Sequence, residues 1–186
     1  MLTCLVRTSY RPKQFSRCIK SIHDECNIIV SYDDERALPY IKKVERFIGR
    51  ICIEKKIGEF AYNDYCNTLK DSLIHGHGIF IDDDDTMIKD CLDYLQLVDG
   101  VSYIVPFMRG NYEKPDLARR RQKIIQVGYI GLPCLILWHG HKDLIHFDST
   151  EFSDYNAIKS LSKQVPLQWL DEPVVNSEKR GWGRTE

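Results

Sequence analysis

The chain has 186 residues, of which 43% are hydrophobic and 28% are charged, and its formal net charge at pH 7 is -1. These values are ordinary for a globular domain, and the near-neutral charge gives no overall electrostatic case for a nucleic acid or an anionic membrane as partner. Seven scattered cysteines without a CxxC pair favour reduced thiols over a disulfide framework or a thiolate zinc site. No run of residues approaches a membrane span and the N-terminal residues lack a secretory signal, so we expect a soluble, cytoplasmic protein.

The first half of the chain alternates between strand-like and helix-like stretches. Apolar runs predict four strands, over residues 2–6, 27–32, 50–54 and 78–81. A helix is predicted after each strand from these inward-facing positions at helical spacing: Phe15, Cys18, Ile19 and Ile22; Leu38, Ile41, Val44 and Ile48; Tyr62, Tyr65, Leu69 and Leu73; Ile88, Cys91, Leu92 and Leu95. This alternation favours an α/β fold with a mostly parallel sheet, helices on both faces, and ligands at the carboxyl ends of the strands.

The second half of the chain is less regular. The expected elements are strands over 101–107 and 134–138, a hairpin partner of the second strand over 144–147, a helix over 152–163, and closing segments over 165–170 and 173–175. Residues 109–126 are polar and at most partly helical. No internal repeat or low-complexity linker divides the chain, so we expect a single domain.

The most informative stretch is the apolar run 78–81, which leads directly into four consecutive carboxylates, Asp82 to Asp85. Such a cluster repels itself in water, and a divalent cation at the end of a strand would neutralise it. Because carboxylates offer only oxygen ligands, the ion would be Mg²⁺ or Mn²⁺. The alternatives are a solvated acidic loop and an Asp cap on the helix expected after Thr86.

Polar residues also follow the first two predicted strands. Thr8, Tyr10 and Arg11 come after the first strand, and Asp33 and Asp34 come after the second. A nucleotide fits this set, since an aromatic ring can stack on a base, a carboxylate can accept from base or ribose, and an arginine can bind phosphate. Taken singly, these side chains could equally be ordinary loop residues or helix caps.

Taken in order, LVRTSYRP, IIVSYDD, AYND with Asn67, and GIFIDDDD resemble the nucleotide-sugar half of family 2-like glycosyltransferases of the GT-A fold, over residues 2–98. The resemblance implies a single α/β domain with a mostly parallel, mixed sheet and helices on both faces. Residues 1–98 would form the nucleotide-sugar-binding half, which ends in the DxD region. Residues 99–186 would form the acceptor-binding half of the same domain.

The resemblance also implies roles for individual side chains. Asp82 and Asp84 match the outer positions of the DxD pattern, where Asp84 would contact the metal through which the donor diphosphate is held. Asp83 and Asp85 would touch the sugar or support these ligands. The remaining donor-binding candidates are Thr8, Tyr10, Arg11, Asp33, Asp34, Asn63, Asn67 and Lys70. For Asn63, Asn67 and Lys70, which lie one turn apart, a polar helix face is the alternative explanation.

A catalytic base is implied on a helix of the second half. The stretch Ser153-Asp154-Tyr155-Asn156 is similar to the acidic-aromatic context of that base in the family, which makes Asp154 the candidate, with Glu151 and Asp148 as competitors. The alternative for Asp154 is an acid at a helix start, where the helix dipole favours it.

We therefore expect a metal-dependent glycosyltransferase that moves a sugar from a UDP-linked donor to a hydroxyl acceptor with inversion. One alternative is a nucleotidyltransferase, although RTSYRP lacks the glycine-rich phosphate loop such enzymes normally have. Another is a non-catalytic module or subunit that binds a nucleotide sugar. The chain could form a homodimer.

Three further features of the sequence remain open. The pairs His75-x-His77 and His139-x-His141 could bind zinc, and one of His139 and His141 could serve the catalytic cation. The basic run Arg119 to Arg121 could guide a polyanionic acceptor, nucleic acid included, or form a solvated face. Arg184 in the polar tail could reach phosphate, or the tail could be disordered.

Overall fold

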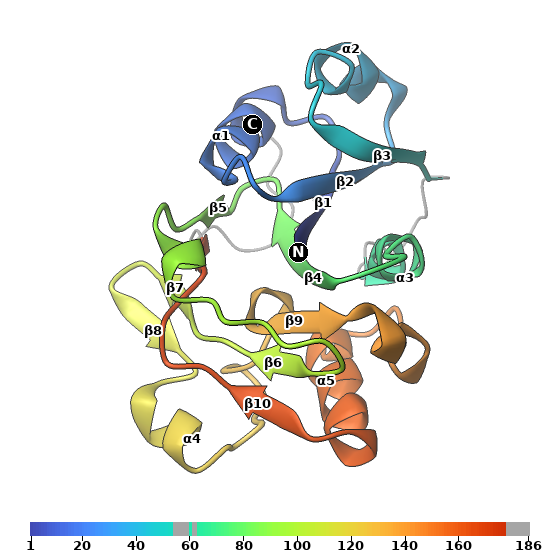
Figure 1. Ribbon diagram of the computed structural model, residues 1–186. Coiled ribbons are helices and arrows are strands. Elements are labelled where there is room, and N and C mark those ends of the chain that lie inside the picture. Colours follow the sequence, from blue (N-terminus) through green and yellow to red (C-terminus); the bar gives the residue numbers. More distant parts are fainter. Residues whose placement is uncertain (54–59, 61–62, 178–186) are drawn as a thin grey trace.

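The computed structural model describes residues 1–53, 60 and 63–177 (Figure 1). Its main sheet has the strand order β10-β6-β9-β4-β1-β2-β3. These strands are β1 (Leu2–Thr8), β2 (Asn27–Tyr32), β3 (Phe47–Cys52), β4 (His77–Asp82), β6 (Ser102–Ile104), β9 (Leu135–Trp138) and β10 (Leu167–Trp169). Strands β3, β2, β1 and β4 are parallel, and β9 is antiparallel to both β4 and β6. The predicted mostly parallel, mixed sheet is confirmed.

A second, smaller sheet forms beside the first, in the order β5-β11-β7-β8. It consists of β5 (Thr86–Met87), β11 (Val175–Ser177), β7 (Phe107–Arg109) and β8 (Tyr112–Lys114). Strand β5 follows the acidic turn directly, and its partner β11 comes from the end of the described chain. The C-terminal part of the chain thus closes against the segment that follows the aspartates.

Five α-helices and four short 3₁₀ helices are present among the described residues. The α-helices are α1 (Pro12–Ser21), α2 (Leu38–Ile41), α3 (Asn63–Asp71), α4 (Leu117–Arg121) and α5 (Ser153–Gln164). The 3₁₀ helices are η1 (Glu35–Ala37), η2 (Cys91–Asp93), η3 (Leu132–Cys134) and η4 (His139–Leu144). No helix of these described segments is both long and apolar enough to cross a membrane.

The helices cover the two faces of the sheet because side chains alternate along β1. Cys4 faces α1, where it lies near Cys18, whereas Arg7 faces α3 and contacts Cys66. Gly78 in β4 leaves room for Leu73, which follows the end of α3, and for Leu5 of β1, since a Cβ at this position would lie only 2.9 Å from a side-chain atom of each. The segment that leads into α5 is bound to α3, since Asn63 of α3 donates to the Thr150 carbonyl (2.9 Å) just before α5 begins.

Two predicted elements of the first half were wrong. The stretch around Ile88 is not a helix: β5 pairs antiparallel with β11, the Ile88 amide donates to the Val174 carbonyl (2.9 Å), and only η2 is helical. A partner almost ninety residues away supplies these hydrogen bonds, which local periodicity does not reveal. The helix expected over 38–48 ends at Ile41, because the chain turns there and enters β3 already at Phe47.

Two predicted elements of the second half also differ. The strand expected over 101–107 is divided between the two sheets at Pro106, which has no amide hydrogen to donate to a ladder. The hairpin partner expected over 144–147 is absent, since the chain leaves β9 through the 3₁₀ helix η4. Helix α5 and strand β9 lie where the sequence predicted them.

Candidate functional site

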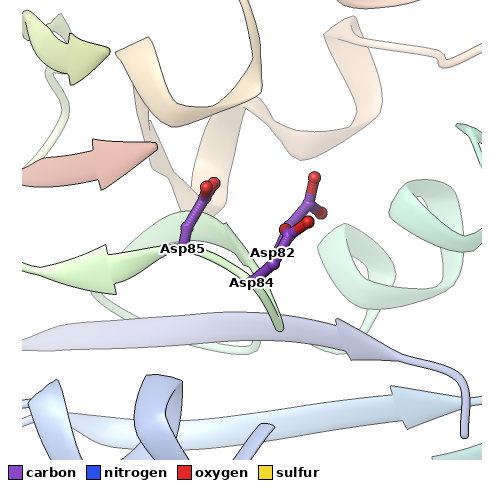
Figure 2. Close-up of side chains that lie close together, drawn as sticks. All are labelled: Asp82, Asp84 and Asp85. Atoms are coloured by element: carbon purple, nitrogen blue, oxygen red, sulfur yellow. The ribbon is translucent and has the colours of Figure 1, made fainter. Parts of the chain in front are cut away.

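The four aspartates form a tight turn at the carboxyl end of β4. The Asp85 amide donates to the Asp82 carbonyl (2.9 Å), and this closed turn brings Asp85 beside Asp82. Figure 2 shows the carboxylates of Asp82, Asp84 and Asp85 projecting from the same side of the turn. One oxygen from each lies within 4.8 Å of the others, which is close enough for all three to bind one ion. Among the described residues, no other group of three potential ligands is as close together.

Asp83 points away from this group and into the protein. Its side chain is fully buried, and its carboxylate accepts hydrogen bonds from the Thr8 hydroxyl (2.6 Å) and from Nε of Arg11 (3.2 Å). Burial raises the pKa of Asp83 to about 6, although the charge of Arg11 and the hydrogen bond from Thr8 oppose this rise. Asp83 therefore ties the turn after β1, which carries Tyr10, to the acidic turn.

Arginines from the β1 segment balance much of the remaining acidic charge. Arg7 and Asp82 are opposite one another in the β1–β4 register and form a two-pronged ion pair, with Nη2 to Oδ2 at 2.8 Å and a second bond from Nε to Oδ1. Burial would raise the pKa of Asp82, but Arg7 outweighs this effect and holds that pKa below its ordinary value. Burial and the neighbouring Asp82 raise the pKa of Asp84, against the attraction of Arg11 at 3.2 Å.

Asp154 lies near the acidic turn, in the first turn of α5. Its Oδ2 accepts a hydrogen bond from the Leu132 amide (3.3 Å), while its Oδ1 is buried and has no hydrogen-bond partner among the described residues. Burial raises the pKa of Asp154, with the charge of Arg7 acting against this and that of Asp82 adding to it. The competing acids Asp148 and Glu151 are both exposed. Asp154 thus has one buried oxygen without a hydrogen-bond partner in the described chain, and its role as the base stays a prediction.

The structure distinguishes between the two aspartates after β2. Asp34 caps η1 by accepting from the Arg36 amide (2.9 Å), and its carboxylate is paired with the guanidinium of Arg36. Asp33 accepts from the Tyr65 hydroxyl (3.0 Å), and its Oδ1 is buried without a hydrogen-bond partner in the described part of the chain. Asp33 is therefore better placed than Asp34 to bind a ligand. Asp34 is a helix cap, which was the alternative to a binding role.

Tyr10 stands at the surface beside this strand end. It is 47% exposed, and the Arg36 guanidinium lies 4.6 Å from the centre of its ring. Tyr40 is tilted against it at 6.4 Å between ring centres. An exposed aromatic ring at the carboxyl edge of a parallel sheet suits stacking with a base.

The polar side chains of Asn63, Asn67 and Lys70 on α3 make hydrogen bonds within the protein. Asn67 accepts from the Phe147 amide (2.9 Å) and donates to the Phe147 carbonyl (2.7 Å), and Asn63 donates to the Thr150 carbonyl (2.9 Å). Lys70 is largely buried and donates to Asp71 (2.6 Å). The two asparagines therefore tie α3 to the segment that leads into α5. Donor contacts of these three residues stay a prediction.

The histidine pairs lie at the opposite end of β4 from the aspartates. His77 is buried and its Nε2 is 2.9 Å from the Val101 carbonyl oxygen, while Nδ1 of His141 is 2.9 Å from the Ser102 hydroxyl. Because β9 runs antiparallel to β4, its end at Trp138 pairs with His77, so His139 and His141 do not approach the acidic turn. The idea that one of them serves the cation is wrong.

The basic run in α4 is mostly engaged within the protein. Arg120 is buried, pairs with Glu113 (2.8 Å) and donates to the Pro115 carbonyl (2.9 Å). The guanidinium of Arg119 lies 3.5 Å from the centre of the Tyr129 ring. Two of the three cations thus have structural partners, and a polyanionic acceptor stays a prediction. Arg184 lies outside the described residues.

Arg7 and Asp85 are the members of the site whose positions were not predicted. The signal for Arg7 was present in the sequence, because a lone arginine inside the apolar stretch LTCLVRT must find a buried partner. The signal for Asp85 was absent, since spacing alone favours alternate residues, and the turn that brings Asp85 to Asp82 appears only in the structure.

Comparison with solved structures identifies the fold. S. aureus TarS residues 1–349 in complex with UDP-GlcNAc superposes with a TM-score of 0.75 over 98% of this chain at 15% identity, and the structure of the same fragment without a named ligand gives 0.74 over 95% at 14% identity. The complex of that fragment with UDP gives 0.69. The match covers 59–60% of the fragment, so this chain spans about three fifths of its length. No protein-family model matches the sequence, and no curated protein matches it either. The GT-A fold expected from the sequence is confirmed.

Proposed function

We propose that this chain is a glycosyltransferase that transfers a sugar from a UDP-linked donor to a hydroxyl acceptor with inversion, and that it depends on Mn²⁺ or Mg²⁺. The observation that carries the proposal is the convergence of the acidic turn and Asp154 at the carboxyl ends of β1 and β4. In an α/β sheet this edge is where ligands bind. The TarS fragment with the same fold has been crystallised with UDP-GlcNAc and with UDP, which supports the choice of donor.

The acidic turn suits a hard divalent cation. Asp82, Asp84 and Asp85 offer only oxygen atoms, and these are close enough to share one ion. Arg7 and Arg11 pair with Asp82, Asp83 and Asp84 and offset part of the negative charge of the turn, and a divalent ion would offset more of it. When bound there, the ion would stabilise negative charge on the departing nucleoside diphosphate. Asp84 and Asp82 would hold it, as the DxD resemblance implies, and Asp85 would join them.

The donor would be held by the strand ends of β1 and β2. The exposed ring of Tyr10 would stack on the base, and the unused oxygen of Asp33 would accept a hydrogen bond from the nucleoside. Thr8 and Arg11 bind Asp83, so they would fix the loop that carries Tyr10 next to the diphosphate. In this proposal the donor would lie across the edge of the sheet, with its sugar directed toward Asp154.

Asp154 would act as the general base. Its unpaired Oδ1 would accept the proton of the acceptor hydroxyl while that oxygen attacks the anomeric carbon from the side opposite the leaving diphosphate, which inverts the configuration. Because burial raises the pKa of this carboxyl, it is a better proton acceptor than an ordinary aspartate.

The proposal is tested by a thermal-shift panel of UDP-, GDP- and other nucleotide-linked sugars, each with and without Mn²⁺. We expect stabilisation by a UDP-linked sugar only when the metal is present. The same donors are then incubated with the protein and sugar acceptors, and released UDP and the anomeric configuration of the product are measured. Binding without any turnover would favour the non-catalytic module, and a product with retained configuration would remove the assignment of Asp154.

A further inference from the structure

Arg7 is a charged residue in a strand that is otherwise buried. Its side chain is 15% exposed, and its neighbours in β1, Val6 and Thr8, are both buried. An arginine in such a position is stable only if its donors are satisfied and its charge is paired. The groups that bind the Arg7 guanidinium and balance its charge therefore indicate the role of this side chain.

Groups from three separate elements act on Arg7 in the described part of the chain. Asp82 of β4 receives two hydrogen bonds from the guanidinium, through Nε and Nη2. Cys66 of α3 lies 3.5 Å from Nη1. Asp154 of α5 experiences the charge of Arg7 directly. One guanidinium thus binds a cation-site carboxylate and acts electrostatically on the candidate base.

We propose that Arg7 is a positioning residue, which orients the Asp82 carboxylate in the cation site and presents a positive charge that favours the ionised form of Asp154. This inference rests on the function proposed above. It extends that function, because it states that one buried side chain, Arg7, acts on both carboxylates that the reaction uses, Asp82 and Asp154. The two-pronged geometry fixes both oxygens of Asp82, which a single hydrogen bond would not do.

The surroundings of Asp154 make this assignment specific. The titratable groups that face it are Arg7 from β1, Asp82 from β4, Cys66 from α3 and Cys134 from η3. Burial raises the pKa of both thiols to about 12, so they are neutral near pH 7. Asp82 opposes ionisation of Asp154, and Arg7 is the group of this set that favours it. Loss of the guanidinium would therefore leave the hydrogen bond from the Leu132 amide as the remaining described contact that favours the ionised form, against burial and the like charge of Asp82.

The test uses variants of Arg7 and a direct measurement of Asp154. In Arg7→Met the charge is lost, whereas Arg7→Lys keeps the charge but cannot make the two-pronged contact. Arg120→Met is the matched control, because Arg120 is also a buried arginine in an ion pair but lies in α4. The titration of the Asp154 carboxyl is followed by ¹³C NMR, with its signal assigned from an Asp154→Asn sample. This measurement requires neither metal nor turnover.

We expect the Asp154 midpoint to rise by about one pH unit or more in Arg7→Met, to stay near the wild-type value in Arg7→Lys, and to remain unchanged in Arg120→Met. In Arg7→Lys, the Mn²⁺ dissociation constant measured by calorimetry should increase several-fold, because Asp82 is no longer held by two bonds. If Arg7→Met does not fold, Arg7→Gln replaces it, since glutamine is neutral but retains a donor for Asp82.

Two outcomes would overturn the inference. One is an Asp154 midpoint that is the same in the neutral Arg7 variants and in the wild type, and the other is an unchanged Mn²⁺ affinity in Arg7→Lys. Failure of the proposed function gives a different result. In that case the wild type releases no UDP from any donor, while the Asp154 midpoint still follows the charge at position 7.

Discussion

Replacement of Asp154 by Asn should separate catalysis from stability, because the two should change in opposite directions. Asn keeps the shape of the side chain and can still accept from the Leu132 amide, but it cannot take a proton at neutral pH. A general base contributes about 10²- to 10⁴-fold to a rate. We therefore expect kcat to fall by that factor, which corresponds to about 3–5 kcal/mol in the activation barrier, with little change in donor affinity.

The stability of the same variant should increase. Burial raises the pKa of Asp154, so the folded protein binds its proton more tightly than the unfolded chain does, and the ionised form costs folding free energy at pH values above the folded pKa. The cost is about 1.4 kcal/mol for each unit by which the pKa is raised, and it disappears as the pH falls below the unfolded value of about 4. In a chain of this size each kcal/mol corresponds to about 2–4 °C in Tm.

The assay combines steady-state transfer kinetics with thermal denaturation between pH 4 and pH 8. At pH 8 the Tm of Asp154→Asn should exceed that of the wild type, and this difference should disappear near pH 4. Asp148→Asn is the control, because Asp148 is an exposed acid of the preceding segment. Unchanged transfer, or a lower Tm at pH 8, would show that Asp154 is an acid that stabilises the start of α5 through the helix dipole.

Three further substitutions probe the rest of the site and the core. Asp84→Ala should abolish the Mn²⁺ dependence of donor binding in the thermal-shift assay without loss of the fold, and a shift equal to that of the wild type would contradict the cation site. Asn67→Ala should lower the free energy of unfolding in urea by about 1–3 kcal/mol, because it leaves the buried backbone of Phe147 without two hydrogen bonds. His77→Phe should flatten the loss of stability below pH 6.5. Burial lowers the pKa of His77, so in that range the unfolded chain binds more protons than the folded protein, and an unchanged pH profile would refute this.

Much of the fold could be predicted because its signals are local. Strands β1 and β4 are buried on both faces, so they appear in the sequence as continuous apolar runs that end in polar residues. Helix α1 has a proline in its first turn and buries Phe15, Cys18 and Ile19 on one face. The acidic turn could be located for the same reason, since it follows directly on the apolar run of β4.

The parts that could not be predicted depend on contacts between distant segments. Strand β5 is only two residues long and exists because β11 pairs with it, so nothing in residues 86–95 alone excludes a helix. The difference between Asp83 and Asp85, for which the expectation from the sequence was the same, has a similar reason. Thr8 and Arg11 from another strand end draw Asp83 inward, and Asp85 takes its place beside Asp82 and Asp84.

The geometry of the site depends on the register in which β1 pairs with β4. Arg7 lies opposite Asp82 because β1 pairs with β4 in parallel, and both side chains point to the face that α3 covers. A slip of one residue would turn Arg7 to the α1 face, where Cys4 and Val6 are packed, and would leave its charge in the core without a partner. The ion pair therefore selects the register that assembles the site. Four adjacent aspartates can be accommodated in the folded protein because Arg7 of the neighbouring strand β1, and Arg11 after it, supply positive charge next to them.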